Sequence, residues 1–284
     1  MRWIPSCRLG GAWQMAIDAW LLDRSLAAAD PLGQVSPSAP IRPVSVPVFR
    51  LYRWARPTLS LGWHQRRLEP HWMELARRGR IDLVRRPSGG RAVLHGTDLT
   101  YALVWPRPRG SRSEVYGRAL QWLVHAFAAM GLPLRTGQRA AGAQRSSCFA
   151  TATVADLVHD GGAKRVGSAQ LWRGGHLLQH GSIQLAPCPS LWREVFGADP
   201  PPLDPLPLEG EALEEHLRRS ALRWLPMDNG GEGATGQGSE DSLPPETPLS
   251  AAELALIAPT LSHYRPTWPF GGVTSPELTM PRAT

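Results

Sequence analysis

The sequence predicts a mixed α and β fold up to about residue 200, followed by a partly disordered C-terminal extension. Apolar residues make up 42% of the 284 positions, which is enough for a sizeable core. Stretches with helical apolar spacing are interspersed with short stretches of the kind that form strands. The segment 226–248 is rich in Gly, Pro and acidic residues, and such a segment buries too little apolar surface to order itself.

The first elements follow from the spacing of apolar residues. A helix is predicted over 11–29, where Trp13, Ile17 and Leu21 recur at helical spacing. Repeated prolines between 30 and 47 predict a loop. The segment VFRLYRW at 48–54 alternates apolar and basic residues, which predicts a half-buried strand. The same signals predict a helix at 70–79 and strands at 58–61, 81–85, 91–94 and 99–105.

The clearest helix is predicted over 113–131, with Ser113 as its N-cap and Gly131 as its C-cap. Three short strands separated by glycine turns are predicted at 154–159, 164–171 and 176–185. These elements complete a domain over 1–200. Beyond it the sequence predicts a helical extension at 201–225, a disordered acidic linker at 226–248, and a C-terminal tail at 249–284 that begins with a short helix at 249–257.

Charge is unevenly distributed along the chain. Residues 1–200 carry 26 Arg and Lys against 12 Asp and Glu, giving +14, whereas residues 201–284 carry 5 against 12, giving −7. A basic body favours an acidic partner, either a nucleic acid or an acidic carrier protein. A compositional bias toward arginine, without meaning for partners, is the alternative interpretation.

Lys164 is the only lysine among the 31 basic residues. Arginine is a flat, permanently charged fork, whereas lysine is a compact donor on a flexible stem. A single retained lysine therefore suggests a site that needs a point donor near a reacting carbonyl. The alternative is a chance survivor of the arginine bias.

The cysteines and histidines limit the chemistry further. Three cysteines are too few to predict a disulfide framework, and they form no CxxC metal pair. Cys148 lies in the polar, electropositive segment RSSCF, where a thiolate can be accessible, although an inert cysteine remains the alternative. His176 and His180 are four residues apart on a predicted strand with no third ligand, so no metal is expected.

No membrane-spanning segment is predicted, because no window approaches the roughly 20 apolar residues that a spanning helix needs. Asp18 and Asp23 interrupt the apolar stretch near the N-terminus, so no signal peptide is expected either. We therefore expect a soluble, cytoplasmic protein.

Two glycine-containing clusters suggest a ligand site. In RRPSGGRAVLH at 85–95, adjacent glycines let the backbone turn tightly, and their N–H groups can form an anion-binding nest beside Arg86 and Arg91. An ordinary hairpin turn is the alternative. In KRVGSAQ at 164–170, strand alternation places Lys164 and Val166 on one face, and the small residues that follow leave room for a ligand.

Six motifs in order carry a resemblance to a known family. They are MAID at 15–18, SLGWHQ at 60–65, RPSGGRAVLH at 86–95 with LTY at 99–101, SCF at 147–149, KRVGSAQ at 164–170 and QHGSI at 179–183. Together they resemble the biotin/lipoate protein ligase superfamily of the lipoate ligase A/B type, over about residues 12–190. Within it the chain is most similar to the cysteine-dependent octanoyltransferases that act on acyl carrier protein. ATP-using ligases typically have a third glycine where Arg91 stands, and they need no cysteine at position 148.

The resemblance implies an α+β fold with a mixed, mostly antiparallel sheet flanked by helices and an acyl chain held beside the glycine loop. It also implies transfer of an octanoyl group from an acidic acyl carrier protein to a lysine of a lipoyl domain. In that reaction Cys148 accepts the acyl group and Lys164 stabilises the oxyanion. No cofactor, metal, nucleic acid or membrane partner is expected, and the protein is expected to be a monomer.

The resemblance further implies a set of acyl-binding residues around the glycine loop and the two neighbouring strands. They are Arg86, Ser88, Gly89, Gly90, Arg91, Ala92, His95, Gly167, Ser168, Ala169, His180 and Gly181. His95 is expected to shape the pocket, with general base as its alternative role. Gly96 departs from the family, which commonly has an acidic residue there.

Three other functions stay open. An ATP-dependent lipoate- or biotin-protein ligase would exchange ATP with pyrophosphate. An amidotransferase that moves acyl groups between lipoyl domains would use the same cysteine chemistry with another donor. A non-catalytic protein that binds a carrier or a nucleic acid would also use the basic body, but aromatic residues do not interleave with the basic ones as single-strand binding requires.

Overall fold

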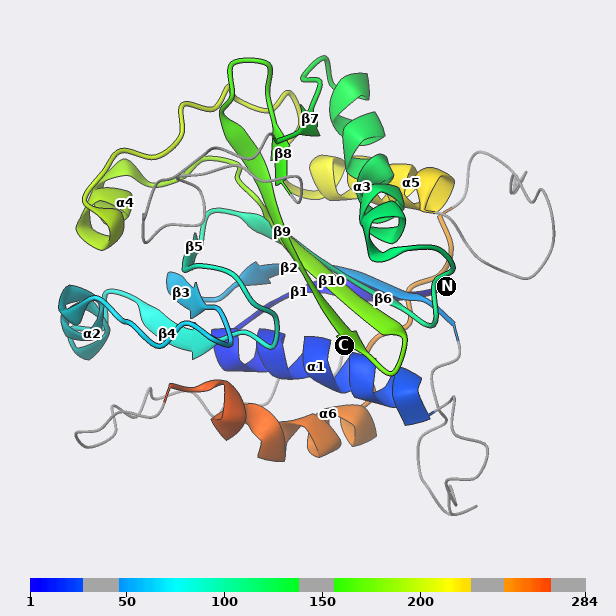
Figure 1. Ribbon diagram of the computed structural model, residues 1–284, viewed down its shortest axis with the longest axis horizontal. Helices are drawn as coiled ribbons and strands as arrows, with labels where there is room; N and C mark the ends of the chain where they lie inside the picture. The colour runs from blue at the N-terminus through cyan, green and yellow to red at the C-terminus, as the bar shows by residue number, and fades with distance from the viewer. Residues whose placement is uncertain (28–45, 138–155, 226–242, 267–284) are drawn as a thin grey trace.

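A seven-stranded sheet forms the centre of the molecule in the computed structural model, which describes residues 1–27, 46–137, 156–225 and 243–266 (Figure 1). Only the first pair, β1 and β2, is parallel, and each later pair is antiparallel. The predicted mixed, mostly antiparallel sheet is therefore confirmed. In spatial order the strands are β1 (Arg2–Leu9), β2 (Val48–Trp54), β6 (Leu99–Trp105), β10 (His176–Ile183), β9 (Lys164–Arg173), β8 (Asp156–Val158) and β7 (Arg135–Thr136).

Helices cover both faces of this sheet. On one face lie α3 (Arg112–Ala129) and α5 (Gly210–Trp224), and on the other lies α1 (Gly11–Ala27) (Figure 1). Strand β6 shows why both faces need cover. Tyr101 and Leu103 lie in the core against α3, whereas Ala102 and Val104 lie in the core against α1. A strand buried on both faces is apolar throughout rather than alternating.

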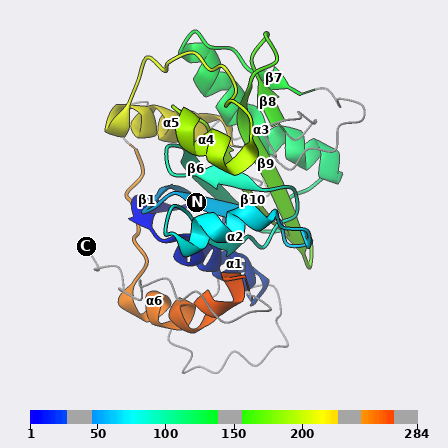
Figure 2. The same cartoon turned by 90° about the vertical axis from the view of Figure 1, so that its left-hand side faces the viewer.

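α1 is itself enclosed. The short helix α6 (Ala251–Ile257) and the 3-10 helix η2 (Ala258–Tyr264) lie on its side away from the sheet, as Figure 2 shows. Leu254, Ile257 and Leu261 join the same core as α1. Because both sides of α1 are covered, its buried residues extend round most of its circumference.

A smaller three-stranded sheet stands beside the first. Its order is β4 (Asp82–Arg85), β3 (Thr58–Leu61) and β5 (Val93–His95), with β3 and β4 parallel and β3 and β5 antiparallel. The helices α2 (Pro70–Arg77) and α4 (Pro189–Phe196) pack against it through Trp72, Trp192 and Val195. The two sheets together position the site described below.

The structure confirms the predicted helices and strands and corrects their details. The N-cap of α3 is Ser111 rather than Ser113, because the Ser111 hydroxyl accepts from the Glu114 backbone N–H and the Glu114 carboxylate accepts from the Ser111 backbone N–H. Gly131 has a φ of +75° and lies one residue beyond the C-cap, Met130. The predicted loop at 30–47 and most of the linker fall outside the described residues.

Four elements of the described chain have no counterpart in the sequence analysis, namely β1, β7, α4 and η2. Strand β1 contains Pro5, and its pairing with β2 is irregular between Ile4 and Cys7. Proline is confined to edge strands and bulges, so the strand lacks the usual alternating signal. Helix α4 begins with Pro189 directly after Cys188. The division at residue 200 stays a prediction, although α5 shares a core with α3 through Leu213 and Leu217.

Among the described helices, none has the length and apolar character to cross a lipid bilayer.

Candidate active site

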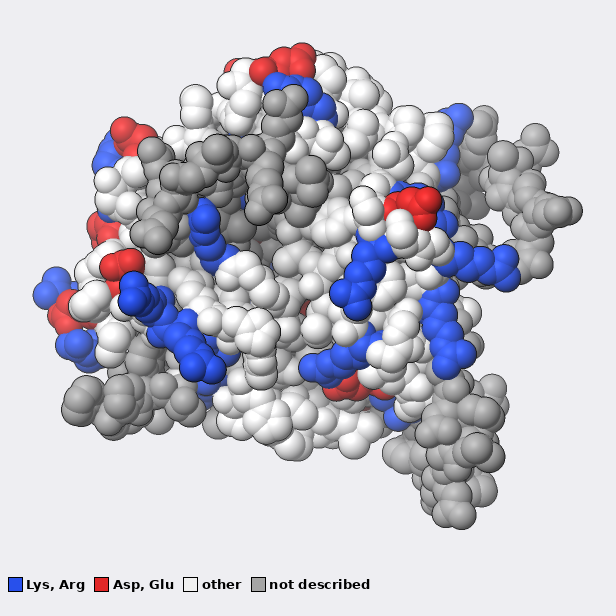
Figure 3. All heavy atoms as spheres, in the orientation of Figure 1, with Lys and Arg blue, Asp and Glu red and all other residues white. Residues whose placement is uncertain are grey.

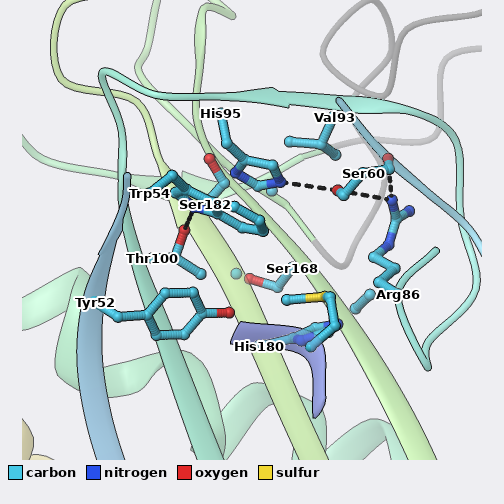
Figure 4. Close-up of a pocket in the computed structure, with 14 residues that line it drawn as sticks. Tyr52, Trp54, Ser60, Arg86, Val93, His95, Thr100, Ser168, His180 and Ser182 are labelled. Carbon is cyan, nitrogen blue, oxygen red and sulfur yellow. Dashed lines mark hydrogen bonds between the residues drawn. The ribbon is translucent and has the colours of Figure 1, made fainter. Parts of the chain in front are cut away.

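A cavity lies between the small sheet and the large one (Figure 4). Its walls come from α1, from strands β2, β6, β9 and β10 of the large sheet, from β3 and β5 of the small one, and from the segment that follows β4. The lining residues in the described part of the chain are Met15, Tyr52, Trp54, Ser60, Arg86, Val93, His95, Thr100, Gly167, Ser168, Ala169, His180, Gly181 and Ser182. Apolar walls with a few polar groups are typical of small-molecule sites.

Seven of the twelve residues expected to bind the acyl group line this cavity. They are Arg86, His95, Gly167, Ser168, Ala169, His180 and Gly181. The other five belong to the turn before β5 and are not among the described lining residues: Ser88, Gly89, Gly90, Arg91 and Ala92. Lys164 lies on β9 outside the described lining, and Cys148 falls outside the residues that the structure describes.

Arg86 holds the glycine turn rather than projecting charge from it. Its Nη2 donates to the carbonyls of Gly89 at 2.8 Å and Arg91 at 2.7 Å. Its Nη1 donates to the Ser60 carbonyl on β3 at 2.9 Å. Gly90 has a φ of +98°, and a Cβ there would approach Arg86 Nη2 to 2.7 Å. The predicted tight turn is thus stabilised by a buried guanidinium bound to carbonyl oxygens.

Two glycines near this turn, Gly62 and Gly89, differ in the space available for a side chain. A Cβ on Gly62 would overlap the carbonyl oxygen of Gly90, whereas a Cβ on Gly89 would meet nothing within 4 Å. We expect Gly62→Ala to lower the free energy of unfolding in urea by about 1–3 kcal/mol, because the two backbone segments must separate. Gly89→Ala, as the matched control, is expected to change it by less than about 0.5 kcal/mol. Equal effects would contradict this assignment.

His180 is fixed between a hydroxyl and a carboxylate. Its Nε2 lies 2.5 Å from Ser88 Oγ and its Nδ1 lies 3.0 Å from Asp18 Oδ2. Tyr52 donates to the same Asp18 oxygen at 3.0 Å, and Arg50 lies 3.6 Å from the other oxygen. Burial, followed by the charge of Asp18, raises the pKa of Tyr52 well above its usual value.

A second histidine has a parallel arrangement. His95 Nε2 lies 2.8 Å from Ser60 Oγ, and its Nδ1 lies 2.7 Å from Asp98 Oδ2. Burial alone would raise the pKa of the Asp98 carboxyl, but His95 and the hydrogen bonds from Ser182 and Gly96 outweigh it and lower that pKa. Trp54 stacks on the imidazole at 3.9 Å between ring centroids.

Sequence reasoning missed half of the cavity and both carboxylates. Five of the missed lining residues stood inside the quoted motifs without being marked as lining the cavity: Met15, Ser60, Val93, Thr100 and Ser182. Asp18 offered the clearest signal in the sequence, since it is an acidic residue in an apolar helix. The structure shows that it is fully buried. Tyr52 and Trp54 lie outside those motifs, and only the pairing of β2 with β6 brings this strand to the cavity.

Lys164 and Val166 lie on opposite faces of β9, which corrects the prediction from strict alternation. β8 pairs Leu157 with Val166 and Val158 with Lys164, so Arg165 is an extra residue in β9. Leu157 and Val166 face the core against α3. Asp156, one residue from Leu157, faces the other way and pairs with Gly167 of the cavity wall. Lys164 Nζ lies 2.9 Å from Asp156 Oδ1, with both side chains buried, so the amine is on the cavity's side of the sheet.

Gly181 serves the packing of the sheet rather than leaving room for a ligand. A Cβ there would lie 2.5 Å from Tyr101 Cε1 and 2.7 Å from Ser168 Oγ. Ser168 Oγ is itself hydrogen-bonded to the Tyr101 hydroxyl at 2.8 Å. Burial raises the pKa of Tyr101 to about 12, so the phenol stays protonated.

The chain is similar in sequence to known proteins. A family model described as the lipoyl protein ligase A/B catalytic domain matches residues 11–198. The chain is 36% identical to octanoyltransferase LipM of Carboxydothermus hydrogenoformans over 190 residues, which cover 64% of each chain. It is 40% identical to LipM of Kyrpidia tusciae over 151 residues, or 49% of this chain and 54% of that protein. It thus spans less than two thirds of the length of these relatives.

Among solved structures, the fold is similar to one described as a bi-partite lipoate protein ligase and its E2 lipoyl domain from Thermoplasma acidophilum. The TM-score is 0.63 at 16% identity, over 92% of each chain. This likeness concerns the fold.

Proposed function

Because this chain belongs to the lipoyl protein ligase A/B catalytic domain family, we propose that it transfers an octanoyl group from acyl carrier protein to a lysine of a lipoyl domain. The observation that carries the proposal is the similarity, at 36% and 40% identity, to proteins named octanoyltransferase LipM. The largely apolar cavity between the two sheets supports it, since its walls suit a medium-length acyl chain.

The reaction divides into two transfers. The Cys148 thiolate attacks the thioester of the octanoyl carrier protein, the carrier thiol leaves, and an acyl-enzyme forms. The amine of the acceptor lysine then attacks this thioester and forms an amide. Thioester exchange is nearly balanced in energy and amide formation is downhill, so the reaction needs no ATP.

Lys164 has the properties of an oxyanion donor. Its ammonium is buried and held by Asp156 on the same side of the sheet as Gly167 and His180. A cation fixed in a site with little water stabilises the negative charge that develops on the acyl oxygen in each transfer. Asp156 is then a positioning residue for this ammonium.

Surface charge supports acidic protein partners. Basic side chains outnumber acidic ones on the face drawn in Figure 3. Exposed arginines of the described chain include Arg66, Arg67, Arg107, Arg109 and Arg112. A surface of one sign accelerates encounter with a partner of the other sign. We propose a monomer that meets its acidic carrier in the cytoplasm, where thiols stay reduced. The similarity in fold to a lipoate ligase studied with its lipoyl domain supports a lipoyl domain as the acceptor.

The proposal is tested by incubating the protein with octanoyl carrier protein in the absence of ATP. We expect the intact chain to gain the mass of one octanoyl group less one hydrogen, and the adduct to disappear when a lipoyl domain is added. Exchange of ATP with pyrophosphate in the presence of free octanoate or lipoate, without any adduct, would instead identify an ATP-dependent ligase. An adduct formed from an octanoyl lipoyl domain but not from the carrier would identify the amidotransferase.

A further inference from the structure

Ser60, His95 and Asp98 form a continuous hydrogen-bonded chain that begins at the cavity. Ser60 and His95 both line the cavity, and Ser60 Oγ lies 2.8 Å from His95 Nε2 (Figure 4). Asp98 lies behind the imidazole, 2.7 Å from Nδ1. All three residues are at least nine-tenths buried. A nucleophile or proton donor, a base and a carboxylate that orients the base have this geometry in many acyl-transfer enzymes.

The surrounding hydrogen bonds allow a relay in one direction. Arg86 Nη1 can only donate, and it lies 3.3 Å from Ser60 Oγ, which leaves the Ser60 hydroxyl hydrogen available for His95 Nε2. His95 Nδ1–H then donates to the Asp98 carboxylate. With this tautomer, Nε2 is the acceptor that faces the cavity side.

Other contacts fix the orientation of the imidazole and of the carboxylate. Trp54 stacks on His95 at an interplanar angle of 18° and donates from Nε1 to Thr100 Oγ1 at 2.9 Å. Thr100 and Ser182 each donate to Asp98 Oδ2, at 3.1 Å and 2.6 Å. A carboxylate with this many donors stays ionised and stabilises an imidazolium beside it.

The other hydrogen-bonded series, Ser88–His180–Asp18, is less suited to proton uptake. Its hydroxyl, on Ser88, is not among the described lining residues of the cavity. Its carboxylate, Asp18, already faces the guanidinium of Arg50 at 3.6 Å. A carboxylate next to a permanent cation stabilises a new imidazolium less than one surrounded by neutral donors.

We propose that Ser60, His95 and Asp98 form a proton relay that deprotonates the acceptor lysine for the amide-forming step. This inference rests on the proposed octanoyl transfer and names the groups that make its second half possible. A lysine amine has an ordinary pKa of about 10.4, so at neutral pH it is protonated and cannot attack. The ammonium gives one proton to Ser60 Oγ while the Ser60 proton passes to His95 Nε2. Ser60 contacts the substrate, His95 stores the proton, and Asp98 is a positioning residue.

The step is balanced as follows. The neutral amine nitrogen forms a bond to the acyl carbon, the carbon–sulfur bond breaks, and its electron pair leaves with the thiolate. The thiolate takes the second proton from the nitrogen. The imidazolium releases the first proton to solvent, so the sum is an amide, a thiol and one proton from an ammonium and a thioester.

Four ionisable side chains contact the His95 imidazole directly, reach it through Ser60, or line the same cavity. Asp98 follows it in the chain, Arg86 reaches it through Ser60, Tyr52 of β2 lines the same cavity, and His180 lies on β10 across the cavity. The positive charge of Arg86 opposes protonation of His95, and the negative charge of Asp98 favours it. Asp98 has the larger effect because it contacts the imidazole directly. The relay therefore holds a proton transiently next to a compensating charge.

The test compares two amines on one acyl-enzyme. Wild type and His95→Asn are loaded with octanoyl from octanoyl carrier protein, the donor is removed, and loss of the adduct is followed by intact mass after adding a lipoyl domain or hydroxylamine. Hydroxylamine is largely unprotonated at neutral pH and needs no base. The Asn amide can still donate to Asp98 but offers no proton acceptor at the Nε2 position.

We expect His95→Asn to slow transfer to the lipoyl domain about 100-fold at neutral pH, because general bases typically contribute roughly 100- to 10,000-fold. The deficit is expected to shrink as the pH rises, and transfer to hydroxylamine to stay within about twofold of wild type. Ser60→Ala is expected to show the same pattern while leaving the imidazole in place. His263→Asn, at an exposed histidine on η2, is the matched control and should change neither rate.

Two results would overturn the relay. Equal losses with both amines would mean that His95 only maintains the shape of the cavity, and no loss with either would mean that the proton leaves by another route. Failure of the wild-type chain to acquire any octanoyl adduct would instead overturn the proposed function. The two failures are therefore distinguishable in one experiment.

Discussion

Replacing Cys148 by alanine is expected to abolish the octanoyl adduct that the wild-type chain forms with octanoyl carrier protein. The sulfur is the only atom of that side chain that can form a thioester, so no partial activity through the same intermediate is possible. The measurement is the intact mass of the protein after incubation without ATP. Overall transfer to a lipoyl domain is expected to be lost in parallel.

Cys188 supplies the matched control for this experiment. It is exposed, and a hydrogen bond from Ser190, with backbone N–H groups and Arg80, lowers the pKa of its thiol. It is therefore the cysteine of the described chain best suited to capture an acyl group by accident. Cys188→Ala is expected to leave the adduct unchanged. An adduct that persists in Cys148→Ala and disappears in Cys188→Ala would contradict the assignment of the nucleophile.

Removing the Lys164 amine is expected to slow octanoyl transfer about 100- to 1000-fold, the usual consequence of losing one oxyanion donor. Lys164→Arg keeps the charge, but a planar fork cannot place a single donor where the ammonium stood, so it is expected to lose most of the activity. The measurement is the single-turnover rate of adduct formation from octanoyl carrier protein.

A structural role for the same lysine must be separated from a catalytic one. Lys164 is buried against Asp156, and removing one member of a buried ion pair commonly costs about 3–5 kcal/mol of stability. The double variant Lys164→Met with Asp156→Asn removes both charges and is expected to fold, because replacing the whole pair is often close to neutral. We expect this folded variant to remain 100- to 1000-fold slower, as for loss of one donor. Recovery of wild-type rates in it would show that Lys164 serves only to neutralise Asp156.

The family and the fold class were predictable because they depend on local pattern. The apolar spacing of 11–27, the alternation in 48–54 and the helical pattern of α3 are properties of neighbouring residues, and the structure confirms that these three elements form. Their details depend on the rest of the fold: β2 is buried on both faces rather than half-buried, and the N-cap of α3 is Ser111 rather than Ser113. The six ordered motifs identified the lipoate ligase A/B type family, and the family model that matches residues 11–198 confirms it. Edge strand β1 was not predicted, because Pro5 interrupts the alternation of apolar and polar residues on which strand predictions depend.

The candidate site was predictable only in part, and the reason is geometric. The glycine segment and the strands KRVGSAQ and QHGSI together contain the seven correctly predicted cavity residues, since residues close in sequence stay close in the fold. The side-chain orientation of Lys164 was predicted incorrectly, because an extra residue in β9 shifts the alternation that the sequence suggests. The location of Cys148 relative to this lysine stays a prediction.

The sequence by itself determined the family, most of the helices and strands, and a basic body with a single lysine, since each of these depends on residue types and their spacing along the chain. Only the tertiary structure decided which polar groups meet. Asp18 joins His180 across 162 positions, and Ser182 joins Asp98 across 84, because strands β6 and β10 pair and α1 packs beneath them. Hydrogen bonds act over about 3 Å, whereas local pattern carries no information on which distant segments come that close.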